Sequence, residues 1–139
     1  MRALLDANVL VSALLSNRGA PARLVERWLA GEYELVVCER LLSETASTLA
    51  SPKVSSRLET EDAAPFIRLL RELGDVVPDP IEPPPLRSPD PGDDYLLALA
   101  AREQVMLVSG DGHLLGLSEF APIFAPRAFL DTLEAETNR

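Results

Sequence analysis

Short apolar runs alternate with segments of helical periodicity along most of the chain. The apolar runs are typical of buried strands, and apolar residues spaced three or four positions apart indicate helices. We expect strands over residues 2–5, 33–38, 75–77, 105–109 and 122–124. We expect helices over residues 9–15, between Pro21 and Gly31, between Cys38 and Ser51, and over 60–73, 93–102, 113–117 and 126–134. This alternation predicts an α/β fold with a parallel sheet covered on both faces.

Residues 78–91 interrupt the alternation because they contain seven of the 12 prolines of the chain. Proline lacks a backbone N–H and disrupts regular elements, so we expect an irregular, rigid connection there. The segment that follows is too short to fold alone, and 139 residues is about the length of one domain. A single domain over residues 1–139 is therefore expected.

The composition is that of an ordinary globular protein, with 47% hydrophobic and 25% charged residues. No apolar run approaches the ~18 residues of a membrane span, and the start does not resemble a signal peptide. We therefore expect a cytoplasmic protein with no membrane partner. Cys38 is the only cysteine, which excludes an internal disulfide, and we expect it to be a buried apolar residue.

The formal net charge of −9 argues against a broad basic surface that grips phosphates without regard to sequence. An acidic chain can still cut nucleic acid when its carboxylates converge on divalent cations, because the occupied site is far less negative. The acidity also suits a basic protein partner, although a solvated surface that promotes solubility is the simpler explanation.

Asp6 is the strongest single candidate for chemistry, because it directly follows an apolar strand and has apolar neighbours on both sides. A carboxylate at the carboxyl end of an inner strand points into the crevice where open α/β sheets bind ligands. Burying it without a partner is costly, so a cation or a hydrogen-bond network must lie beside it. Asn8 adds an amide that can bond to this carboxylate or begin the next helix.

Four further acidic residues stand beside predicted sheet ends, namely Glu44, Asp93, Asp94 and Asp111. Three or four carboxylates from separate segments suit Mg²⁺ or Mn²⁺, which prefer oxygen ligands. Each position also has a structural interpretation. Asp93 and Asp94 suit the amino end of a helix as caps, and Asp111 suits a turn between glycines. Glu44 suits a solvated helix face.

Other catalytic chemistries find no support in the sequence. His113 is the only histidine, and we expect it on a surface or in a turn rather than as a ligand or base. The lone cysteine has no paired base, and no glycine-rich phosphate loop occurs. Nucleophilic triads and P-loop mechanisms are therefore not indicated.

Four segments resemble the PIN domain family in the same order and spacing, and the branch they are most similar to consists of toxins of bacterial toxin–antitoxin systems. The segments read LLDANVLVSALL, VVCERLLSETASTLASPKV, SPDPGDDYLLALA and VMLVSGDGHLL, and PRAFLDTL resembles the final helix of that branch. The resemblance implies a three-layer α/β/α fold with a central, mainly parallel sheet. It also implies a metal-dependent ribonuclease whose acidic residues cluster at one end of that sheet.

The resemblance assigns the four acidic positions of the family to residues of this chain. The assigned residues are Asp6, Glu44, Asp94 and Asp111. The adjacent Asp93 leaves the third assignment open by one residue, and Asn8 and Ser109 match polar positions near the same site. The chain departs from the branch at three places. Gly92 stands where the branch usually has an acidic residue, Cys38 where it has a serine, and Gly112–His113 where it has a Lys-Asp pair. The missing lysine puts a nearby phosphate contact in doubt, not the metal site.

The implied reaction is hydrolysis of an RNA phosphodiester by water activated on Mg²⁺ or Mn²⁺. Arg18, Arg23 and Lys53 are the basic residues expected near RNA phosphates. The resemblance also implies a homodimer that binds a small basic antitoxin, which the net charge suits. Two alternatives remain open. A receiver-like module that binds Mg²⁺ would need a late lysine, and none follows Lys53, whereas a catalytically inactive interaction domain would use its acidic residues only as caps.

Overall fold

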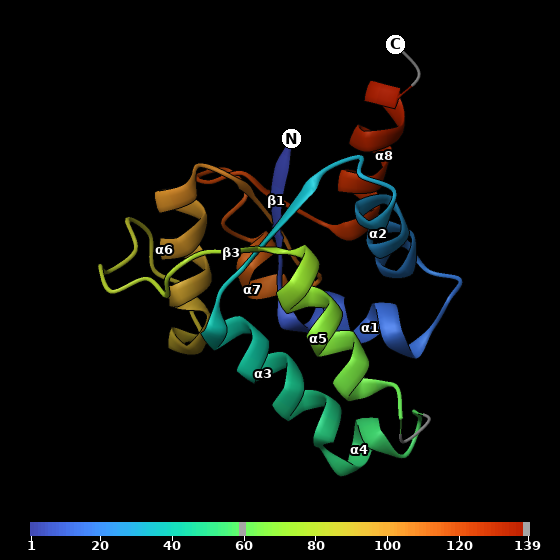
Figure 1. Ribbon diagram of the computed structural model, residues 1–139. Coiled ribbons are helices and arrows are strands. Elements are labelled where there is room, and N and C mark those ends of the chain that lie inside the picture. Colours follow the sequence, from blue (N-terminus) through green and yellow to red (C-terminus); the bar gives the residue numbers. More distant parts are fainter. Residues whose placement is uncertain (59–60, 138–139) are drawn as a thin grey trace.

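The computed structural model describes residues 1–58 and 61–137, and within them a five-stranded sheet forms the centre of the fold (Figure 1). The strands are β1 (Arg2–Leu5), β2 (Glu34–Val37), β3 (Asp75–Val76), β4 (Met106–Val108) and β5 (Ile123–Phe124). Their order in the sheet is β3-β2-β1-β4-β5, and every neighbouring pair is parallel. The predicted strands and the predicted parallel sheet are confirmed.

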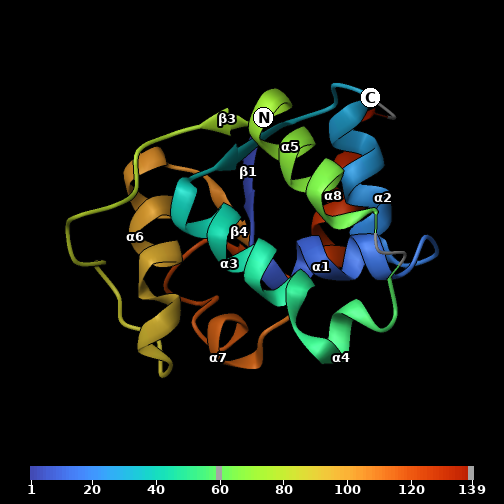
Figure 2. The same ribbon diagram turned by 60° about the horizontal axis from the view of Figure 1, so that its bottom comes forward.

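Helices cover both faces of this sheet. They are α1 (Ala7–Leu15), α2 (Ala20–Leu29), α3 (Glu39–Ala50), α4 (Pro52–Ser55), α5 (Ala63–Leu73), α6 (Asp94–Glu103), α7 (Gly112–Leu115) and α8 (Pro126–Thr137). Figures 1 and 2 both place α6 on one side of the strands and α1, α2 and α8 on the other. The three-layer α/β/α arrangement is therefore confirmed. No helix in the described part of the chain is long and apolar enough to cross a membrane.

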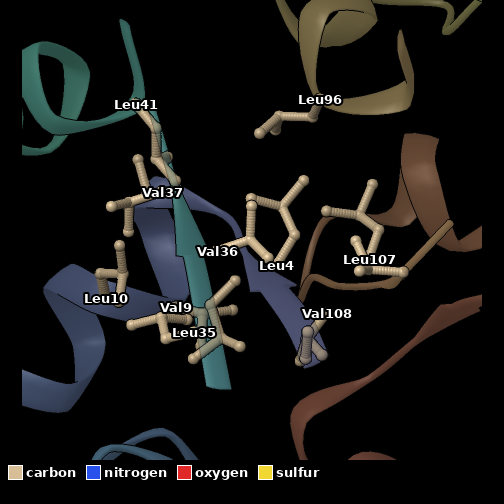
Figure 3. Packing of buried hydrophobic residues seen from close by; sticks show 14 of the residues in the cluster. Leu4, Val9, Leu10, Leu35, Val36, Val37, Leu41, Leu96, Leu107 and Val108 are labelled. Carbon is tan, nitrogen blue, oxygen red and sulfur yellow. The ribbon is translucent and has the colours of Figure 1, made fainter. Parts of the chain in front are cut away.

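The core is built where the three central strands lie side by side (Figure 3). Leu4 of β1 is in register with Val36 of β2 and Leu107 of β4, and none of the three is more than 1% exposed. Leu96 from α6 and Leu10 from α1 enter the same cluster from opposite layers. Strands buried on both faces read as continuous apolar runs, which is why the sequence pattern identifies them.

Several element boundaries differ from the predicted ones. Helix α1 begins at Ala7 rather than Val9, because the Asp6 side chain caps it and accepts a hydrogen bond from the Val9 N–H at 2.9 Å. Helix α4 was not expected; Pro52, at its first position, has a φ angle suited to a helix start. Helix α5 begins at Ala63, and the proposed cap Thr60 lies outside the described residues.

Two further boundaries, at the start of α6 and at the end of α8, also differ from the predicted ones. The proline-rich connection is irregular as predicted up to Asp90, but it ends in a 3-10 turn, η1 (Pro91–Asp93), so the following helix starts at Asp94 rather than Asp93. Helix α8 continues to Thr137, three residues beyond the predicted end. Asp93 therefore closes η1 and Asp94 opens α6, so the two adjacent aspartates belong to different elements.

The direction in which successive strands are added to the sheet reverses between β1 and β4. From β1 the chain proceeds outward to β2 and β3, and it then returns to β4 and continues outward to β5 on the other side. In open α/β sheets, ligands bind beyond the carboxyl ends of the strands at such a reversal. The residues that directly follow β1 and β4 are Asp6 and Ser109.

Candidate active site

Asp6 and Ser109 link the carboxyl ends of β1 and β4. Asp6 is only 4% exposed, and one of its carboxylate oxygens accepts the capping hydrogen bond from Val9. The other oxygen accepts a hydrogen bond from the Ser109 hydroxyl, which is itself fully buried. The sequence predicts a hydrogen-bond network or a cation beside Asp6, and the structure shows the hydrogen-bond network.

The environment of Asp6 disfavours its charge. Burial is the main cause that raises the pKa of Asp6, and the nearby negative charges of Asp111 and Glu44 raise it further. The hydrogen bonds from Ser109 and Val9 act in the opposite direction. A buried carboxylate that is held in place while other carboxylates repel it is a good potential ligand for a cation.

Asp93 and Asp94 have separate surroundings, although they are adjacent in the chain. The Asp94 carboxylate accepts a hydrogen bond from the Ser88 N–H at 2.8 Å and lies 3.3 Å from the Arg87 guanidinium. Asp93 has a buried oxygen, Oδ2, that has no hydrogen-bond partner. Burial, followed by the charges of nearby aspartates, raises the pKa of Asp93 to about 6. Asp94 therefore anchors the proline-rich connection, and Asp93 is the member of the pair that lies near the other carboxylates.

The aspartates whose charges act on Asp93 identify its neighbours. They are Asp90, Asp111 and Asp6, in decreasing order of effect. Asp111 itself caps the start of α7, where its side chain accepts a hydrogen bond from the His113 N–H at 2.8 Å. Its own N–H donates to the Ser109 hydroxyl at 2.9 Å. Ser109 therefore holds Asp6 and Asp111 on the same side of the sheet.

Glu44 reaches the site from α3 and is half-buried rather than solvated. Its carboxylate accepts a hydrogen bond from the hydroxyl of Tyr95, at the start of α6. Burial, together with this bond to Glu44, raises the pKa of Tyr95, so the hydroxyl keeps its proton and remains a donor. The sequence analysis did not identify Tyr95 as a site residue, and its only signal was its position directly after the two aspartates.

The other candidates lie at the rim or away from the site. Asn8 is exposed and lines a hollow of about 340 Å³ together with Asp111. His113 is exposed, as predicted, with its Nδ1 atom 3.7 Å from an oxygen of Asp111. The three basic residues expected to contact phosphates are all exposed, on the turn before α2, on α2 and on α4; they are Arg18, Arg23 and Lys53.

The acidic residues are neighbours without forming a complete coordination shell. Across residues 1–58 and 61–137, no group of three or more His, Cys, Asp or Glu side chains is arranged so that it could hold a metal ion. The donor chemistry nevertheless fits a hard divalent cation, because carboxylate oxygens surround the site and Asp93 Oδ2 is buried without a partner.

Comparison with known proteins identifies the family. A family model described as PIN domain matches residues 2–113. The chain belongs to the PIN domain family. PIN domains are generally nucleases. No curated protein matches the chain by sequence.

A solved structure shares the PIN fold of this chain. One similar structure is that of VapBC2 from Rickettsia felis bound to a DNA fragment from their promoter, with a TM-score of 0.59 and 12% sequence identity. The match covers 90% of this chain and 97% of that chain. At this level of identity the likeness concerns the fold, which agrees with the family assignment.

Cys38, where related sequences were expected to have serine, is fully buried as predicted, and burial raises the pKa of its thiol to about 11.

The metal-free PIN domain should lose stability through Asp93 as the pH rises. A carboxyl whose pKa is raised in the folded state binds its proton more tightly there than in the unfolded chain. The stability that this proton contributes is present below the ordinary value of 3.8 and is lost as the pH passes about 6. Glu39 and Glu103 have lowered pKa values and act in the opposite sense. The measurement is therefore the difference between wild type and Asp93→Asn in thermal unfolding with a chelator over this pH range. Identical pH dependence of the two proteins would contradict the prediction.

Proposed function

We propose that this PIN domain is a metal-dependent endoribonuclease that hydrolyses RNA phosphodiester bonds, and that it is the toxin of a toxin–antitoxin pair. The observation that carries the proposal is the buried Asp6 carboxylate at the carboxyl end of β1, where the strand order reverses. The negative charges of Asp111 and Glu44 act on Asp6, and those of Asp111 and Asp6 act on Asp93. Such a concentration of repelling carboxylates lowers stability unless a cation neutralises it, and the family supplies the nuclease context.

The residues that would hold Mg²⁺ or Mn²⁺ are Asp6, Glu44, Asp93 and Asp111. Asp93 replaces Asp94 in this set because Asp94 is occupied by Ser88 and Arg87, whereas Asp93 has an unpartnered buried oxygen. When bound, the cation would lower the pKa of an attacking water and neutralise charge that develops on the phosphate.

The remaining polar residues orient these ligands. Ser109 donates to Asp6 and accepts from the Asp111 backbone, so one hydroxyl sets the positions of two carboxylates. Tyr95 holds Glu44 in the same way. Hydrogen bonds of this kind orient metal ligands from outside the coordination shell, and their loss typically lowers metal affinity or activity by about 10–100-fold. Asn8 stands at the rim, where its amide can contact the RNA strand that enters the hollow beside Asp111.

An antitoxin partner and a homodimer belong to the same proposal. The resemblance to toxins of toxin–antitoxin systems and the likeness in fold to VapBC2 support an antitoxin. The net charge of −9 suits a basic one. A cytoplasmic location follows from this role. The alternative is a catalytically inactive interaction domain, which the incomplete arrangement of ligands favours. Cleavage of structured and single-stranded RNAs with Mn²⁺ or Mg²⁺ separates the two functions.

Replacing Asp6 by asparagine tests the metal-ligand role directly. Asp6→Asn should reduce RNA cleavage by more than the ~10–100-fold typical of an outer-shell partner. Its melting temperature should stay equal or rise, because asparagine still caps α1 and the repulsion between carboxylates is relieved. Cleavage and thermal unfolding are measured with and without Mn²⁺, with Asp131→Asn on the exposed surface of α8 as the control. A purely structural role would instead cost about 1–3 kcal/mol of stability, and full activity would end the ligand assignment.

The two adjacent aspartates should separate into a ligand and an anchor. Asp93→Ala should abolish cleavage and the stabilisation of the protein by Mn²⁺. Asp94→Ala should retain Mn²⁺-dependent stabilisation but lower the free energy of unfolding by about 1–3 kcal/mol, because the Ser88 N–H loses its acceptor. Thermal unfolding across a Mn²⁺ titration measures both effects. The assignment is wrong if Asp94→Ala, rather than Asp93→Ala, removes the response to Mn²⁺.

The assembly is testable on the purified protein. We expect sedimentation at micromolar concentration to show a dimer, and co-expression with the product of a neighbouring gene to yield a stable complex. A strict monomer would remove the dimer from the proposal. RNA cleavage should fall when the co-purified partner is present, since a partner near the acidic site would cover it.

A further inference from the structure

A second concave surface lies at the carboxyl edge of the sheet, beside the acidic residues. It is a hollow of about 270 Å³ between the first turn of α3, the proline-rich connection and the first turn of α6. Its charged and aromatic lining residues are Arg40, Glu82, Arg87, Asp94 and Tyr95. Two arginines meeting in one hollow are notable in a chain with a net charge of −9.

The first arginine is held in place by an aromatic ring. The guanidinium of Arg40 lies 4.2 Å from the centroid of the Tyr95 ring, a contact in which the cation is attracted to the face of the ring. The hydroxyl of the same tyrosine donates to Glu44. One side chain therefore connects the arginine in the hollow to a proposed metal ligand, and Arg40 is positioned rather than free to move with solvent.

The second arginine is oriented by the anchor aspartate. Arg87 lies 3.3 Å from the Asp94 carboxylate, which is only 14% exposed and is fixed by the Ser88 N–H. The Arg87 side chain is 71% exposed, so its guanidinium remains accessible to a ligand. A guanidinium has five N–H donors, and one bond to Asp94 leaves the others available to a phosphate.

The hollow is close to neutral, because Glu82 and Asp94 contribute two negative charges beside the two arginines. Binding of a phosphate there depends on direct hydrogen bonds from the guanidinium groups rather than on a broad positive field. The paired, planar donors of arginine are suited to phosphate oxygens. By contrast, the residues that line this hollow include none of the three basic residues expected from the sequence.

We propose that this hollow, which we call the arginine hollow, binds a backbone phosphate of the RNA strand beside the bond to be cleaved. Arg40 and Arg87 contact the phosphate, and Tyr95 and Asp94 position them. The inference rests on the proposed ribonuclease function and adds a substrate subsite to it. The RNA strand would then pass from the arginine hollow across the acidic centre.

RNA binding by a catalytically silenced protein tests the arginine hollow. Asp6→Asn protein is titrated against a short fluorescein-labelled single-stranded RNA at several salt concentrations without divalent metal. In this background Arg40→Ala and Arg87→Ala should each weaken binding roughly threefold to tenfold, and each should reduce the salt slope by about 0.7. Arg40→Lys should retain part of the affinity, because it keeps the charge but loses the planar donors. Arg68→Ala, on the exposed surface of α5, is the matched control.

Three results would overturn the subsite. The first is that neither Arg40→Ala nor Arg87→Ala changes the affinity or the salt slope of the Asp6→Asn protein, and the second is that Arg68→Ala weakens RNA binding as much as they do. The third is that the Asp6→Asn protein binds no RNA. Thermal unfolding confirms that the variants are folded, and Arg87→Ala removes a mostly exposed side chain. Wild-type cleavage with Mn²⁺ is measured in parallel. Cleavage by wild type with unchanged binding in the alanine variants refutes the subsite alone. Absent wild-type cleavage with weakened binding in the variants refutes the nuclease and retains the phosphate site.

Discussion

The buried charge of Asp6 is the constraint on which the site depends. An isolated carboxylate at the end of a central strand would be costly, and the fold compensates it with the amino end of α1 and the hydroxyl of Ser109. These partners directly follow β1 and β4, the two neighbouring strands at which the order of strand addition reverses. The same hydrogen bonds that make the charge tolerable therefore also fix the point where ligands bind in this class of sheet. Structure and proposed chemistry meet in one carboxylate.

Local sequence signals were sufficient for most of the framework. The strands are short apolar runs buried on both faces, so pattern alone located them and predicted a parallel sheet. Asp6 was identified by the same logic, because a charge inside such a pattern needs a partner. The sequence analysis starts α1 two residues too late, since it considers Asn8 rather than Asp6 as the residue that begins the helix. Asp6 is both the cap of α1 and the proposed ligand.

The contacts that the sequence could not reveal depend on direction or on distance along the chain. Asp93 and Asp94 are equivalent in a pattern, but successive residues of a helix point about 100° apart. Asp93 ends the 3-10 turn, whereas Asp94 begins α6 and is held by Ser88 and Arg87. The pattern alone favours a solvated Glu44, because it lies away from the apolar side of its helix, and only the family resemblance makes it a ligand. Its hydrogen-bond partner is Tyr95, 51 residues later, and only the packing of α6 brings it there.

The proposed ribonuclease, an acidic protein acting on a polyanion, must solve two electrostatic problems in adjacent places. At the acidic centre, negative charge is useful only when a cation is present, so catalysis and metal binding are coupled there. Away from the centre, the strand needs fixed positive charge that does not attract every anion. In the arginine hollow, each guanidinium is restrained by a neighbouring side chain, Arg40 by Tyr95 and Arg87 by Asp94. Because Tyr95 contacts Arg40 and also donates to Glu44, the proposed phosphate site and the proposed metal ligands share one side chain.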